Sequence, residues 1–87
     1  MPTWLALPPR SLALRGGRPQ FQGPLRLLSG PHRVEWFPWA DAEASTQVRD
    51  HHLAHSPGAG LVWVCCERSA ITTATAAPSW WLLGWWA

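Results

Sequence analysis

The segment Leu61–Arg68, "LVWVCCER", carries the most regular strand signal in the chain. Its first six residues are apolar on both faces that a strand would present, and Val62 and Val64 are β-branched. A short, continuous apolar run of this kind is typical of a strand that is covered on both sides. Because Glu67 and Arg68 place charge only at its end, the segment predicts a central, buried strand.

The C-terminal segment 79–87, "SWWLLGWWA", is the second strong signal. It is too short for a membrane-spanning helix, which needs roughly 18 apolar residues or more. As a strand it would present two apolar faces, with alternate residues on each. One face would carry Trp80, Leu82, Gly84 and Trp86, and the other Trp81, Leu83 and Trp85. We expect a closing strand that is covered on both sides or exposes one side to a partner.

Weaker apolar runs predict the rest of a sheet, each bounded by proline or glycine. The expected runs are residues 4–7, 11–14, 25–28, 32–36 and 48–55. The expected breaks are Pro8-Pro9, Gly16-Gly17, a loop at 17–24, a turn at Ser29-Gly30-Pro31, a turn at 56–60 and a flexible loop at 69–79. One or two helical turns within 40–48 remain an alternative for that connection.

These segments favour an all-β fold with five or six short, mostly antiparallel strands curled into a barrel-like or sandwich-like sheet. We expect a single domain over residues 1–87. Its expected parts are an N-terminal extended segment (1–22), the main sheet (23–68), the flexible loop (69–79) and the closing strand (80–87).

The composition describes a small, tryptophan-rich domain of mild charge. A chain of 87 residues buries only roughly 60–65% of its unfolded surface, so its eight tryptophans are first of all core candidates. The formal charge is +2, and the seven arginines are spread along the chain, which permits nucleic-acid contact without arguing for it.

There is no signal-peptide pattern, and the adjacent Cys65 and Cys66 cannot join distant segments. We therefore expect a cytoplasmic protein with no disulfide framework.

Two chemical readings of the histidines and cysteines are weak. His51 and His55 would share one face of a helix, yet adjacent cysteines rarely bind one zinc ion, and on a strand His51 and His52 point apart. A nucleophilic cysteine needs an open, electropositive site, whereas these two lie among valine and tryptophan. The chain also has no phosphate-binding glycine loop and no carboxylate pair suited to nucleotidyl transfer. We expect no enzyme activity, no metal site and no cofactor.

Trp36 and Trp39 are better placed for base stacking than the tryptophans inside apolar strands. They lie beside an expected turn and near Arg33, and exposed aromatic rings beside arginines bind single strands. A core or partner-interface role for these two rings is the simpler alternative.

Four segments in one order then resemble the C-terminal region of the ImuB-type proteins, which are Y-family DNA polymerase-like factors of the bacterial mutasome. The segments are "GPLRLLSGPHRVE" (23–35), "RDHHLA" (49–54), "LVWVCCER" (61–68) and "WWLLGWWA" (80–87), and "WLALPPRSLAL" (4–14) is similar to the stretch that precedes them in that family. The chain departs from the pattern at several places, and its loop at 69–79 is long for the family. His51-His52 replace paired aromatic residues, Cys65-Cys66 replace an aromatic residue and an arginine, and Leu83 replaces a histidine.

The resemblance implies a non-catalytic adaptor domain that acts in damage-induced, error-prone translesion DNA synthesis. The implied partners are a RecA-like protein, an error-prone replicative-type polymerase and the sliding clamp. By resemblance and expected exposure, the partner-binding residues are Arg33, Glu35, Trp36, Trp39, Arg49 and Arg68. The alternative is a single-stranded nucleic-acid-binding module that uses exposed tryptophan and arginine.

Overall fold

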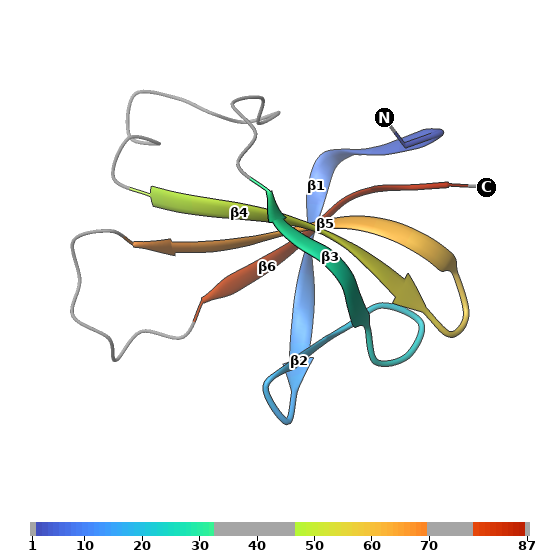
Figure 1. The fold of residues 1–87 in the computed structure, drawn as a ribbon, viewed down its shortest axis with the longest axis horizontal. Helices are drawn as coiled ribbons and strands as arrows, with labels where there is room; N and C mark the ends of the chain where they lie inside the picture. Colours follow the sequence, from blue (N-terminus) through green and yellow to red (C-terminus); the bar gives the residue numbers. More distant parts are fainter. Residues whose placement is uncertain (1, 33–46, 70–77, 87) are drawn as a thin grey trace.

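The protein forms one curled, antiparallel β-sheet in the shape of a half-barrel (Figure 1). The computed structural model describes residues 2–32, 47–69 and 78–86. Its six strands are β1 (Trp4–Arg15), β2 (Arg18–Gln20), β3 (Arg26–His32), β4 (Gln47–Ser56), β5 (Gly60–Ser69) and β6 (Ser79–Trp85). The expected all-β class is confirmed, and the described residues contain no helix long and apolar enough to cross a membrane.

The strands lie in the order β2-β1-β6-β5-β4-β3, so the N-terminal and C-terminal segments meet in the middle of the sheet. Strand β6 pairs with both β1 and β5, which makes "SWWLLGWWA" an interior strand. β5 lies between β4 and β6, as its two apolar faces predicted. The edges of the sheet are the short β2 and the irregular β3.

The β4–β5 hairpin is the most regular part of the molecule. Its ladder runs without a register shift from Gln47 opposite Ser69 to Ser56 opposite Gly60. The predicted turn at 56–60 closes it, with the Ser56 hydroxyl accepting a hydrogen bond from the backbone N–H of Ala59 at 3.1 Å. The strand expected at 48–55 and the strand expected at 61–68 are therefore both confirmed.

Strand β6 contains a bulge at Leu83 that the alternation of its residues did not predict. Gly84 pairs with Trp63 and Leu82 with Val64, so Leu83 is an extra residue in the ladder. The predicted faces hold from Trp80 to Leu83, but beyond the bulge they exchange: Trp85 packs with Leu82 and Trp86 packs with Leu83. The exchange follows from the bulge, because one inserted residue turns every later side chain to the other face.

Strand β1 corrects the prediction that Pro8-Pro9 separates two short strands. Residues 6–9 stand opposite the single residue Leu83, between the pairs Leu5–Gly84 and Arg10–Leu82. The prolines thus occupy an irregular stretch where no ladder N–H is required, and the strand continues to Arg15. Gly84 is needed here because a Cβ atom on it would collide with the backbone of Trp4 and the ring of Pro2.

Strand β3 corrects the prediction of a turn at Ser29-Gly30-Pro31, because all three residues lie within the strand. The β3–β4 ladder shifts register on both sides of Ser29, and Gly30 adopts a φ of +118°. A Cβ atom on Gly30 would lie 2.7 Å from the carbonyl oxygen of His51, so glycine lets β3 approach β4 closely.

The loop expected at 17–24 likewise contains the short strand β2, which continues the sheet beyond β1.

Two apolar clusters pack on the two faces of the sheet. We call the first the inner face, because curling of the sheet brings residues of β1, β4, β5 and β6 together there. Its buried members are Ala6, Leu12, Leu25, Ala54, Val62, Val64 and Leu82. The outer face carries Trp63, Cys65 and Leu83, with Trp81 and Trp86 packed against them. Both faces of β5 and β6 are therefore apolar and covered to different degrees.

Candidate functional site

Four of the six predicted contact residues, Arg33, Glu35, Trp36 and Trp39, lie outside the described residues. The flexible loop expected at 69–79 lies largely outside them as well, as does the possible helical turn at 40–48. Of the predicted set, the structure places Arg49 on β4 and Arg68 on β5.

Arg49 and Arg68 both form ion pairs across the central hairpin. The Nε–H of Arg49 donates to Glu67 Oε2 at 2.8 Å, and these two side chains are only 15% and 17% exposed. Arg68 Nη2 lies 3.3 Å from Asp50 Oδ2, with the arginine 56% exposed. The "RD" of β4 and the "ER" of β5 thus form two ion pairs across the hairpin. Arg49 is largely buried in its pair, whereas Arg68 remains largely exposed to solvent.

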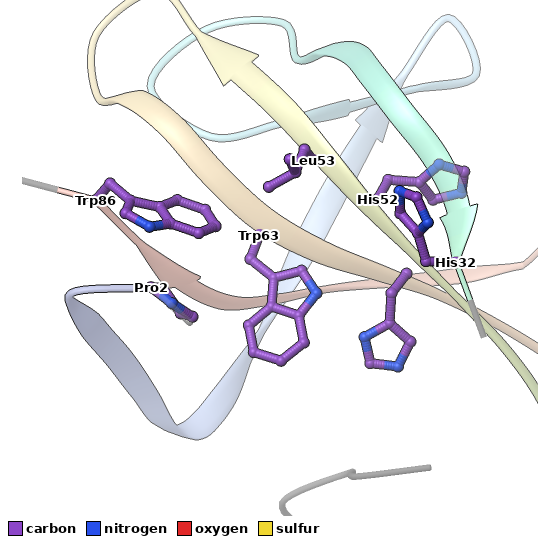
Figure 2. Close-up of a pocket in the computed structure, with 7 residues that line it drawn as sticks. Pro2, His32, His52, Leu53, Trp63 and Trp86 are labelled. Carbon is purple, nitrogen blue, oxygen red and sulfur yellow. The ribbon is translucent and has the colours of Figure 1, made fainter. Parts of the chain in front are cut away.

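A hollow of about 350 Å³ lies beside this hairpin (Figure 2). Its lining comes from four separate parts of the chain: the N-terminal segment, β3, the β4–β5 hairpin and the residue after β6. The lining residues are Pro2, His32, His51, His52, Leu53, Trp63 and Trp86. We call it the aromatic pocket, because the indoles of Trp63 and Trp86 form much of its wall (Figure 2).

The sheet register explains why these side chains meet. Leu53 pairs with Trp63 across the β4–β5 ladder, so both point to the outer face. Residues two apart on a strand share a face, which adds His51, and its ring lies 5.4 Å from the Trp63 ring, centroid to centroid. Trp86 joins them only because of the bulge at Leu83.

Burial favours the uncharged form of two histidines of the pocket, His51 and His52. Burial lowers the pKa of His51, and the nearby Arg49 lowers it further. Burial also lowers the pKa of His52, against a smaller opposing effect of Asp50. His32 Nε2 lies 2.6 Å from the Ser29 hydroxyl. Among the residues that the structure describes, the lining is mostly apolar and aromatic and includes no acidic side chain, which suits an apolar or aromatic side chain better than a cation.

The cysteines are poorly suited to nucleophilic chemistry. Cys65 is fully buried, and burial together with the neighbouring Glu67 raises the pKa of its thiol to about 12. Burial raises the pKa of Cys66 as well. Because the thiolate is the reactive form, both residues act as small apolar side chains of the strand.

The described part of the chain gathers no group of three or more histidine, cysteine, aspartate or glutamate side chains that could hold a metal ion. β4 is a strand, so His51 and His52 point to opposite faces rather than along one helical face.

Sequence reasoning missed Pro2, Leu53 and Trp63 as candidates for binding, and it considered Trp86 only as part of a closing strand that could expose one side to a partner. A signal did exist for two of them, because alternation on adjacent strands places Leu53 and Trp63 on the same side as His51. Pro2 had no such signal, and the meeting of Trp86 with Trp63 depends on the bulge in β6.

Comparison with protein-family models, with curated proteins and with solved structures finds no match for this chain.

Proposed function

We propose that this chain is a non-catalytic protein-interaction domain, related to the C-terminal region of the ImuB-type proteins, that acts as an adaptor in error-prone translesion DNA synthesis. The observation that carries the interaction role is the aromatic pocket, an apolar hollow that opens between four segments of the chain. A cytoplasmic site of action is part of the proposal.

The chemistry of the pocket supports an apolar anchor from a partner. Tryptophans at the centre of an interface contribute most to binding when an apolar side chain of the partner fills the space between them. Trp63 and Trp86 line the pocket, where such a side chain would contact them, and burial favours the uncharged form of His51 beside them.

The class of partner comes from the sequence resemblance. The segments that carry it build β3, β4, β5 and β6, which are the strands around the pocket. The proposed partners are therefore the RecA-like protein, the error-prone replicative-type polymerase and the sliding clamp of the same organism.

The test is a binding measurement between the purified chain and each of these three proteins, by biolayer interferometry. Trp86→Ala removes one wall of the pocket, and we expect it to weaken binding by about 30-fold or more, as truncation of a hot-spot residue does. Trp4→Ala is the matched control, because Trp4 is 55% exposed and does not line the pocket.

Two results would contradict the proposal. Retention of none of the three proteins by the folded chain would remove the adaptor role. Equal loss of binding in Trp86→Ala and Trp4→Ala would show that the partner does not use the pocket.

A further inference from the structure

The arginines in the first part of the chain have no acidic residues among them. The first acidic residue is Glu35, and five of the seven arginines precede it. In the described residues, the only acids are Asp50 and Glu67, and these pair with Arg68 and Arg49. The arginines of β1, β2 and β3 therefore form no ion pair within the part of the chain that the structure describes.

A second hollow, of about 370 Å³, lies where these arginines gather. It opens between the β1–β2 turn and the start of β3, which Figure 1 places at the same end of the sheet. Its lining residues are Gly17, Arg18, Pro19, Leu25, Arg26, Leu27 and Trp80. Arg18 and Arg26 are exposed and come from the two opposite edge strands, so positive charge flanks the hollow on both sides.

The arginine arrangement is electrostatically unfavourable without an anion. Arg15 stands directly opposite Arg18 in the β1–β2 ladder, and like charges in directly opposed positions destabilise a strand pair. Both side chains are exposed, so a bound phosphate would lie within reach of each and relieve their repulsion. An anionic ligand thus gains both direct attraction and the removal of this repulsion.

Trp80 adds a flat, apolar surface to the same hollow. Its ring lies 5.7 Å from the His52 ring, centroid to centroid, and it packs partly buried against the inner face. A half-buried indole beside exposed arginines can stack against a planar nucleic-acid base. Such stacking accepts any base, because every base has an aromatic face.

We propose that this hollow binds single-stranded nucleic acid, with phosphates on Arg15, Arg18 and Arg26 and one base against Trp80. An unpaired strand is favoured over a duplex because only unstacked bases can reach an aromatic side chain in a hollow. The site is distinct from the stacking role considered for Trp36 and Trp39, and it does not rest on the proposed adaptor function.

The test is fluorescence anisotropy of a labelled single-stranded oligothymidine, titrated with the full chain over a series of salt concentrations. Each phosphate contact to a single strand contributes about −0.7 to the slope of log affinity against log salt concentration. Three arginine–phosphate contacts therefore predict a slope of about −2. In Arg18→Gln/Arg26→Gln we expect a slope of about −0.7 and an affinity at least about tenfold lower. Trp80→Leu should weaken binding, whereas Trp80→Phe, which keeps a ring, should retain most of it.

A matched control separates the site from net charge. Arg26→Gln and Thr3→Glu each lower the net charge by one, but Thr3 is exposed and precedes β1, at the opposite end of that strand from the β1–β2 turn. Only Arg26→Gln should lower the salt slope. Circular dichroism of every variant confirms that the sheet is retained.

Three outcomes would overturn the proposal. The first is no binding of oligothymidine at low salt. The second is an equal effect of Arg26→Gln and Thr3→Glu. The third is equal competition by duplex DNA or by polyglutamate of the same charge, which would indicate a general polyanion or acidic-peptide surface instead.

Discussion

The two faces of the sheet are both apolar, yet they are built from different side chains. The centre of the inner face is closed by aliphatic residues, of which Ala54, Val62, Val64 and Leu82 are fully buried, and its aromatic rings lie at the periphery, only partly buried. The outer face presents large rings and polar groups beside them, with Trp63 and His51 next to the Arg49–Glu67 pair. The aromatic pocket opens on this second face.

The difference shows how a small domain divides its tasks between stability and binding. Where aliphatic side chains fill a closed space at high density, as at the centre of the inner face, they stabilise the fold and leave no open space for a partner. Rings with polar edges pack less completely and leave an accessible hollow, which a partner can fill. We therefore expect substitutions on the inner face to act on stability and those on the outer face to act more on binding.

Comparing Leu82→Ala with Leu53→Ala tests the difference between the two faces most directly, because the same truncation is made on each. Leu82 is fully buried on the inner face, so its truncation should lower the free energy of unfolding by about 2–5 kcal/mol. Leu53 is half-buried at the pocket, and the same substitution should cost on the order of 1 kcal/mol. Chemical denaturation of both variants measures the two values, and equal costs would show that the outer face is as much a core as the inner one.

Gly30→Ala tests the point where the edge strand β3 meets the pocket. The positive φ of Gly30 should cost about 1–3 kcal/mol of strain in alanine. The new Cβ atom would also meet the His51 carbonyl oxygen, so the total should exceed the strain alone. Gly16→Ala is the control, because Gly16 also has a positive φ but a Cβ there would meet nothing. Thermal unfolding of the two variants would contradict the close β3–β4 approach if their midpoints fell equally.

Arg49→Met against Arg68→Met compares the two ion pairs of the hairpin. The nearly enclosed Arg49–Glu67 hydrogen bond should contribute about 1–3 kcal/mol, as bonds to charged groups do. Arg68 is 56% exposed, so removal of its pair with Asp50 should cost about 0–1 kcal/mol. Urea denaturation gives both numbers, and a larger loss for Arg68→Met would reverse the roles assigned to the two arginines.

Acidification should destabilise the folded chain, with the smallest effect of the four, because burial lowers the pKa of His51 on the outer face and of His52 on the opposite face. The pKa of His51 is lowered in the folded state, so below pH 6.5 the unfolded chain takes up protons before the folded chain does. The free energy of unfolding should therefore fall as the pH drops from neutral through 6.5 toward the lower folded pKa. His51→Phe should flatten this dependence, and a wild-type stability that is constant or rises on acidification would contradict it.

Much of the fold could be predicted from the sequence, because the central strands have strong local patterns. Val62 and Val64 favour an extended backbone, and the serine, proline and glycines at 56–60 favour the hairpin turn, whatever surrounds them. The irregular strands could not be predicted in the same way. From the local sequence, Pro8 and Pro9 predict the end of a strand. In the structure they lie within β1, where the pairing with β6 is irregular.

The candidate site was predicted less well than the fold. Arg49 and Arg68 were expected to contact a partner, and the structure engages both in pairs within the hairpin. The aromatic pocket combines Pro2, His32 and Trp86, whose residue types carry no signal that they would meet.

The sequence by itself determined which segments extend, how the central hairpin turns and that two faces of β5 would be apolar. These properties follow from backbone preferences and side-chain alternation, which act over a few neighbouring residues. Only the tertiary structure decided that Trp86, rather than Trp85, reaches the outer face, and that Arg18 and Arg26 flank one hollow. The reason is that register shifts and sheet curling depend on how distant strands pair, and one extra residue in a ladder reassigns every side chain beyond it.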